Sequence, residues 1–162
     1  MQAMVILKRC RDAEKEIARI RMRIRQRRDL ATSIGAPALD PNRVGRGSGD
    51  PDKNGRLAAE AVDLQNELQR RMERKAAEEA CACTLLDLVP DAESDVLYHY
   101  YVMRESTGEA ARALHYQDGY VRKVKRRGEE IMRLLSPEKV AEALPAWYLR
   151  EYGDDMTRRV ER

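Results

Sequence analysis

Residues 114–135 read LHYQDGYVRKVKRRGEEIMRLL, a stretch in which apolar residues interrupt a run of Lys and Arg at regular steps. The apolar residues recur every three or four positions, which is the period of one face of an α-helix. We predict that this face is buried; it consists of Val121, Val124, Gly128, Ile131 and Leu135. Basic residues fill the opposite side, which is either a solvated helix face or a surface that lies against phosphates.

The residues before this basic helix predict two further short helices. The expected helices cover about 92–104, 107–114 and 118–135, and the second of them buries Ala110, Ala111 and Leu114. A short helix, a four-residue turn and a basic helix have the spacing of a helix-turn-helix, whose last helix enters the major groove of DNA.

Residues 96–135, VLYHYYVMRESTGEAARALHYQDGYVRKVKRRGEEIMRLL, resemble the sigma-70 region 4-like helix-turn-helix of small phage transcription regulators of the ArpU/RinA late-gene type. The matching positions are Leu97, Tyr101 and Val102 on the first element, Glu109, Ala111, Leu114 and Tyr116 on the second, and Val121 on the third. The helix, Gly/Pro/Asp-rich loop and long charged helix that precede them are also similar in layout to these proteins.

This resemblance implies double-stranded DNA as the partner and assigns the contacting side chains. The groove-facing candidates are Gln117, Gly119, Arg122, Lys123 and Arg126. The candidates for anchoring the DNA backbone are Lys125, Arg127 and Arg133. Arg122 and Lys123 are best placed to reach guanine edges, where a bidentate Arg gives about 1–3 kcal/mol of discrimination.

The sequence departs from the family pattern at several positions. Tyr100 stands where Arg is common, Thr107 where Trp is common, and Ala110 where Ile is usual. His115 replaces the turn glycine, and we expect it to adopt a positive φ, because His is among the non-glycine residues enriched there. Gln117 replaces the usual capping Ser and caps poorly, so we expect Asp118 to cap the helix and start it one residue later.

The rest of the chain predicts an all-α fold: a long helical hairpin or coiled coil followed by a C-terminal helix-turn-helix bundle. The expected segments are an amphipathic helix over 1–31, a Gly/Pro/Asp-rich loop over 32–55, a long helix over 56–89, the helix-turn-helix over 91–136, and a short helix and tail over 137–162. Residues 18–25 alternate between apolar residues and Arg, as a β-strand would. The helical period around them extends over a longer stretch, so we predict a helix here.

Two apolar stripes support the long helices. The stripe of the first helix is Ile6, Cys10, Ala13, Ile17, Ile20 and Ile24. The stripe of the second helix is Leu57, Ala61, Leu64, Leu68, Met72, Ala76, Cys83 and Leu86, with a slip in register after Leu68. Ser136 and Pro137 predict the start of the last short helix as its cap and first residue.

Composition limits the function. The chain of 162 residues is 36% charged and 5% aromatic, and its net charge of +3 is too small to indicate a partner by itself. Three cysteines without framework spacing predict a reducing compartment, and the short apolar run at the N-terminus indicates neither a signal peptide nor a membrane span. We therefore expect a cytoplasmic protein without a membrane association.

No enzyme motif is present in the sequence: there is no Gly-rich phosphate loop, nucleophile elbow or paired-His metal motif. We therefore predict a binding protein that is not an enzyme and that needs no cofactor or metal. The long helices predict a homodimer or a higher homo-oligomer. The aromatic segment 144–149, LPAWYL, either closes the small core or contacts a partner such as RNA polymerase.

Two alternatives to a DNA-binding transcription regulator stay open at the level of sequence. A phage small terminase-like packaging subunit also joins a helix-turn-helix to an oligomerising hairpin, and would form a ring. A helical interaction protein with no role in nucleic-acid binding would use the same stripes. A sigma factor is disfavoured, because no promoter-melting region precedes the motif.

Overall fold

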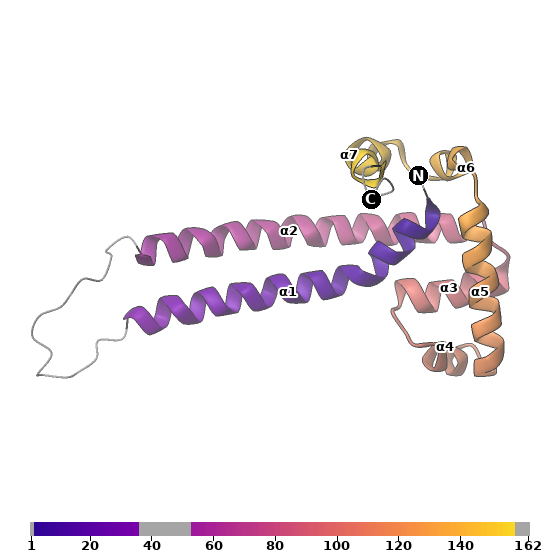
Figure 1. Cartoon of the computed structure of the whole chain (residues 1–162), viewed down its shortest axis with the longest axis horizontal. Coiled ribbons are helices and arrows are strands. Elements are labelled where there is room, and N and C mark those ends of the chain that lie inside the picture. Colours follow the sequence, from indigo (N-terminus) through magenta and orange to yellow (C-terminus); the bar gives the residue numbers. More distant parts are fainter. Residues whose placement is uncertain (1, 36–52, 158–162) are drawn as a thin grey trace, which may run out of the picture. The chain divides into compact units, whose positions relative to one another are not determined.

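The computed structural model describes residues 2–35 and 53–157. Throughout these residues the regular secondary structure is helical, which confirms the predicted all-α class (Figure 1). None of the helices in the described ranges is long and apolar enough to cross a lipid bilayer.

Within these described ranges, seven α-helices and one π-helical segment follow one another (Figure 1). They are α1 (Ala3–Gly35), α2 (Lys53–Leu86), α3 (Asp91–Leu97), η1 (Tyr98–Val102), α4 (Thr107–Ala113), α5 (Asp118–Leu134), α6 (Pro137–Ala143) and α7 (Ala146–Thr157). The helices group into two compact units. One unit is Lys15–Glu73, and the other combines the residues up to Glu14 with those from Arg74 onward.

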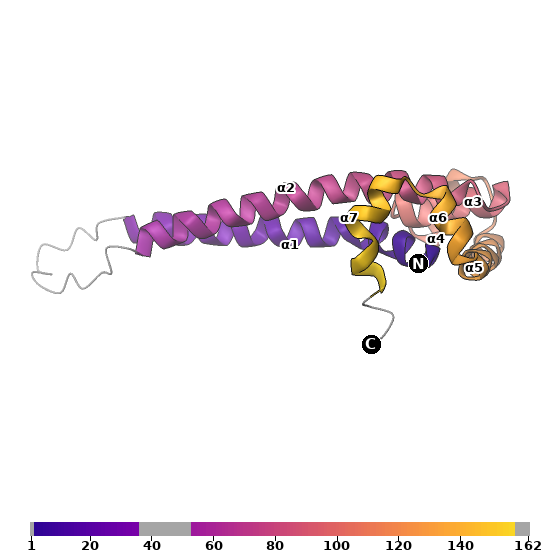
Figure 2. The same cartoon turned by 90° about the horizontal axis from the view of Figure 1, so that it is seen from above.

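In the unit Lys15–Glu73, segments of α1 and α2 lie side by side (Figures 1 and 2). Ile20, Ile24 and Leu64 are buried together, and Leu68 packs against them. Ion pairs flank this seam: Arg71 with Glu16 at 2.6 Å, Arg23 with Glu67 at 3.5 Å, and Arg27 with Glu60 at 3.0 Å. Along α1 the paired residues are Glu16, Arg23 and Arg27, and their partners on α2 run in the opposite order, from Arg71 to Glu67 to Glu60. The two segments are therefore antiparallel.

The predicted stripe of α1 is confirmed, because all six of its residues are buried. The predicted stripe of α2 is correct at Leu57, Leu64 and Leu86, which are buried, but wrong at Met72, Ala76 and Cys83, which are exposed. No slip occurs after Leu68: the steps of three and four continue through Arg71, Lys75 and Glu78 to Ala82 and Leu85. The continuation of the buried stripe was not predicted, because several of its positions carry charged residues. A hydrophobic period in the sequence does not include an Arg or Lys, even one that is partly buried.

Both long helices extend beyond their expected ends. α1 continues to Gly35, and α2 begins at Lys53. A few additional residues extend a helix at little cost, because each gains a backbone hydrogen bond once the helix has formed. The remainder of the predicted loop, residues 36–52, lies outside the described residues.

The second unit has a core drawn from both ends of the chain. Its buried residues come from the start of α1, the end of α2, the α3–η1 segment, α5, α6 and α7. Tyr148 is fully buried in this cluster, and Leu144 is 5% exposed. Of the two alternatives for the aromatic segment, the structure shows the one in which it closes the core. Pro145 separates α6 from α7, so the single short helix expected after Ser136 is replaced by two.

The first helix of the predicted helix-turn-helix ends in a π-helical turn. α3 leads into η1, where the Met103 N–H donates to the Tyr98 carbonyl at 3.0 Å. Met103 is no longer helical, so the expected end at residue 104 is two residues too late. The wider π turn buries Tyr101 and Val102 in succession, and Arg104 then leaves the helix with φ 63°.

Candidate nucleic-acid interface

The helix α4 begins with reciprocal capping between Ser106 and Glu109. The Ser106 hydroxyl accepts a hydrogen bond from the Glu109 backbone at 3.3 Å, and the Glu109 carboxylate accepts one from the Ser106 backbone at 2.7 Å. This capping box satisfies two backbone donors that helix starts leave free. This capping box was not predicted, although the Ser-x-x-Glu spacing at 106–109 is its usual signal in a sequence.

The turn between α4 and α5 is closed by a left-handed residue. His115 has φ 56°, as predicted. The Tyr116 N–H donates to the Ala111 carbonyl at 2.9 Å, and the His115 N–H to the Arg112 carbonyl at 3.4 Å. This pair of bonds is a Schellman motif, which normally places glycine at the left-handed position. The turn therefore reverses the chain tightly enough to present the start of α5 beside α4.

The start of α5 differs from the expectation. Gln117 is the N-cap residue, although its side chain makes no capping hydrogen bond, and Asp118 is the first helical residue rather than the cap. The Gln117 carbonyl already accepts from the Val121 N–H at 3.0 Å. The Asp118 carboxylate instead pairs with Arg122 one turn later, at 2.6 Å. An acidic residue in the first turn stabilises the helix through its macrodipole.

One side of α5 packs against α3 and α4. Val121 and Val124 are buried with Val96, Ala110 and Ala111, as the stripe predicted. Gly128 lies so close to α3 that a Cβ atom there would meet Leu97 Cδ1 at 2.9 Å. The last part of the stripe is wrong, because Met132 is buried whereas Ile131 and Leu135 are only partly buried. At 3.6 residues per turn, a step of four is needed there to stay on the buried side.

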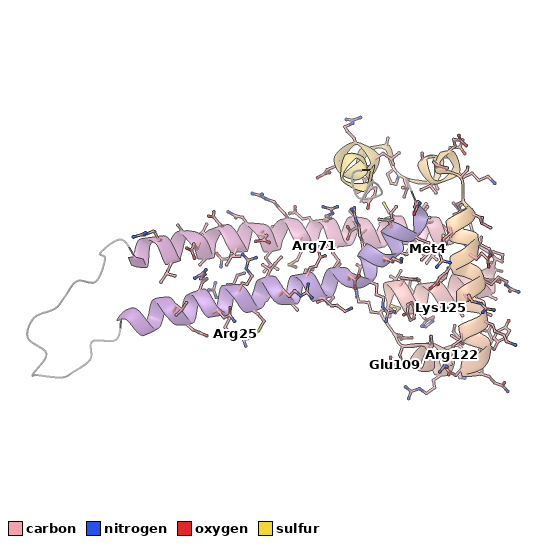
Figure 3. All side chains as sticks on the ribbon, in the orientation of Figure 1. Met4, Arg25, Arg71, Glu109, Arg122 and Lys125 are labelled. Atoms are coloured by element: carbon pink, nitrogen blue, oxygen red, sulfur yellow. The ribbon has the colours of Figure 1, made fainter. Side chains whose placement is uncertain are left out.

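The opposite side of α5 carries exposed basic residues. Arg122, Lys123 and Arg126 are all exposed (Figure 3 labels Arg122 near the start of α5). The Arg122 side chain is 69% exposed despite its pair with Asp118. The side chains of Lys123 and Arg126 make no hydrogen bond or ion pair with any other described residue. Gly119 is exposed one helical turn before them, so Gly119, Arg122, Lys123 and Arg126 share one accessible side of α5, which we call the basic face. Gln117 is exposed at the N-cap, one turn before the buried Val121.

The three expected backbone anchors have partners inside the protein. Arg127 pairs with Glu93 of α3, a carboxylate that is 2% exposed. Lys125 pairs with Glu129 at 2.8 Å, and Arg133 lies 3.5 Å from the same carboxylate. A buried carboxylate left without its cation is strongly unfavourable, so Arg127 stabilises the packing of α5 on α3. The side chains of Arg127 and Arg133 are nevertheless 63% and 57% exposed.

Tyr100 and Tyr101 extend this intramolecular network. The Arg11 guanidinium and the Lys125 ammonium lie 3.6 and 4.0 Å from the centre of the Tyr100 ring, in the range of cation–π contacts. Tyr101 donates to Glu129 at 2.8 Å, and burial raises the pKa of its phenol. The Tyr100 ring thus binds two cations of this chain.

Two exposed tyrosines adjoin the basic face. Tyr116 and Tyr120 are 40% and 46% exposed and contact each other edge to face, with ring centroids 5.2 Å apart. The sequence analysis assigned neither of them to the surface. Their spacing of four residues across a helix start was the available signal, since such residues lie on one side of the chain.

The cysteines and acidic residues form no chemical centre in the described part of the chain. Cys10 and Cys81 are buried, whereas Cys83 is exposed, and all three are free thiols. Burial raises the pKa of Cys10 to about 12 and that of Cys81 to about 11, so neither is a thiolate at neutral pH. No group of three metal-binding side chains is found among these residues.

Comparison of the chain with protein-family models, curated proteins and solved structures found no match.

Proposed function

We propose that this protein is a sequence-specific DNA-binding transcription regulator, in which α4, the turn at His115 and α5 form a sigma-70 region 4-like helix-turn-helix and α5 enters the major groove. The observation that carries this proposal is the basic face. Arg122, Lys123 and Arg126 are exposed together on the side of α5 opposite Val121 and Val124.

The dimensions and chemistry of α5 suit a groove. A helix with its side chains is about 10–12 Å across, and the major groove of B-DNA is about 12 Å wide. The basic face begins within the first turns of α5, where recognition helices contact bases. Arg122 is the candidate for reading guanine, whereas Lys123 and Arg126 have no partners among the described residues and are candidates for phosphates.

Because Lys125, Arg127 and Arg133 have ion-pair partners within the protein, we propose a DNA interface with fewer residues than the sequence predicted. Arg127 holds α5 on α3 through Glu93, whereas Lys125 and Arg133 pair with Glu129 within α5 itself. We assign DNA contacts to the basic face and a positioning role to these three residues. Replacing them should therefore reduce stability as well as any DNA affinity.

A salt titration of duplex binding tests this assignment. With a random pool of 30-base-pair duplexes, Lys123→Ala/Arg126→Ala should weaken binding. It should also reduce the slope of log K against log salt concentration by up to about 1.8, because each lost phosphate contact contributes about 0.9. The matched control is Lys139→Ala/Arg150→Ala, which removes two exposed charges from α6 and α7.

The control variant should bind with an unchanged slope. An equal loss in both variants would mean that net charge alone drives binding, and no binding by the unmodified protein would contradict the proposal outright. Selection of preferred sequences from the same pool then tests specificity: Arg122→Ala should relax the preference for guanine at one position while leaving the salt slope nearly unchanged.

A further inference from the structure

The helix α2 carries a second regular stripe in addition to the one that packs on α1. Its residues follow each other in steps of four and three, as the buried stripe does, but they are exposed: Ala58, Val62, Gln65, Gln69, Met72 and Ala76. Val62 is 53% exposed and Met72 is 42% exposed. We call these six residues the outer stripe.

The outer stripe has an unusual composition for a solvated surface. The chain as a whole is 36% charged, yet none of the six residues is charged. The exposed charges of this part of α2, including Glu60, Asp63, Glu67 and Arg70, lie on other sides of the helix. An uncharged stripe over about five helical turns, with apolar residues at regular steps, is typical of a helix that packs against another helix.

The outer stripe has the same order of residue types, small, apolar and amide, when it is read from either end. Counting outward from Glu67, Gln65 mirrors Gln69, Val62 mirrors Met72, and Ala58 mirrors Ala76. A two-fold axis requires one surface to complement itself. Antiparallel packing of two copies about an axis near residue 67 would place amide against amide, apolar side chain against apolar side chain, and methyl against methyl.

We propose that the outer stripe of α2 is a homodimer interface, and that its occupant is the same stripe of a second copy in antiparallel orientation. The central glutamines hydrogen-bond across the axis, and Val62 packs on Met72 of the second copy at both ends. This inference rests on α2 alone and holds whether or not the basic face of α5 binds DNA.

Sedimentation equilibrium of the full chain tests the interface. The unmodified protein should have the mass of a dimer, and Val62→Lys/Met72→Lys should shift it to a monomer, because two charges on each copy would enter the contact. Ala18→Lys/Met22→Lys is the matched control, since it places two charges at exposed positions of α1, and it should remain dimeric. Circular dichroism shows whether each variant keeps its helix content.

Cysteine cross-linking tests the orientation, in a Cys83→Ser background that removes the exposed thiol. Val62→Cys and Met72→Cys chains should form a disulfide when mixed, but neither should cross-link alone. In the antiparallel dimer, identical positions are ten residues apart along the helix, about 15 Å, whereas a disulfide spans Cα atoms up to about 7 Å apart. A monomeric unmodified protein, a dimeric Lys variant, or cross-linking of each chain with itself would overturn the proposal.

Discussion

At the scale of single residues, two glycines of α5 have opposite environments. A Cβ atom at Gly128 would meet Leu97 Cδ1 at 2.9 Å and Glu93 Cβ at 3.2 Å, whereas a Cβ at Gly119 would have nothing within 4 Å. Leu97 and Glu93 are themselves buried, so neither can easily give way. Gly128 is thus required for the close approach of α5 to α3, and Gly119 is not.

We predict that Gly128→Ala lowers the free energy of unfolding and Gly119→Ala raises it. Overpacking costs about 1–3 kcal/mol, which outweighs the gain of about 1 kcal/mol from replacing glycine within a helix. At Gly119 only the gain applies. Urea denaturation of both variants measures the difference, and a Gly128→Ala protein as stable as Gly119→Ala would show that α5 does not pack as closely as described.

His115 illustrates a residue whose conformation followed from its place in the chain. Its positive φ was predicted because the family pattern has glycine there, and the structure confirms it. Arg104 also has a positive φ, but nothing in the sequence marked it. Its conformation results from the π-helical turn before it and from its ion pair with Glu79, and both depend on packing that a local pattern does not reveal.

At the scale of helices, the two short helices α4 and α6 begin in related ways. Ser106 and Ser136 both cap a backbone N–H three residues later. Only α4 has a carboxylate at that third position, where α6 has Lys139. Hydrogen bonds from the Ser106 backbone and then from its hydroxyl lower the pKa of Glu109 below its usual value of 4.5.

This lowered pKa predicts a pH-dependent contribution to stability. A carboxylate with a lower pKa in the folded state stabilises the protein above its unfolded pKa, and this stabilisation is lost as the pH falls through the folded pKa. Glu109→Gln should therefore destabilise the protein at pH 7, and this effect should shrink as the pH falls through the folded pKa of Glu109. Thermal unfolding over a series of pH values from 7 downward measures this.

Glu138→Gln is the matched control for Glu109→Gln. Glu138 lies in the first turn of α6 but takes no part in a capping box, so its replacement should change stability less at pH 7. Equal effects of the two substitutions would assign the contribution of Glu109 to the helix macrodipole alone.

The seam between α1 and α2 shows why the presence of a helix can be predicted from sequence more easily than the residues through which it packs. The period of Ile17, Ile20 and Ile24 placed them on the buried side of α1 correctly. On α2, Arg71 occupies a seam position with its side chain 13% exposed and paired with Glu16. Met72 was predicted at this part of the seam instead of Arg71. An Arg is favourable at such a buried position only when it forms an ion pair with another helix, and the sequence of α2 does not show that partner.

At the scale of the whole molecule, one core contains residues from both ends of the described chain. Ala3, Ile6 and Leu7 of α1 belong to the same buried cluster as Val140 of α6 and Tyr148 of α7. The end of α5 joins this cluster through Met132, whereas Val121 and Val124 behind the basic face are buried in a separate cluster with Val96, Ala110 and Ala111. Tyr148 and Trp147 are neighbours in the chain, but Tyr148 is fully buried and Trp147 is 50% exposed.

We predict that Tyr148→Ala lowers the free energy of unfolding by about 3–5 kcal/mol, as for other buried aromatic side chains. Trp147→Ala should change it by no more than about 0.5 kcal/mol, the range of exposed substitutions. Chemical denaturation of the full chain compares the two. A large loss in Trp147→Ala would indicate that α7 contacts a surface other than this core.

The sequence by itself determined the helical class, the stripe of α1, the helices α4 and α5, and the exposed positions Arg122, Lys123 and Arg126. These features depend on local periodicity and backbone preference, which act over a few turns. Only the tertiary structure decided that Lys125, Arg127 and Arg133 pair within the protein, that α7 closes the core, and that Met72 lies outside the hairpin seam. Each of these depends on which distant side chain is near, and a helical period specifies a face without specifying what that face meets.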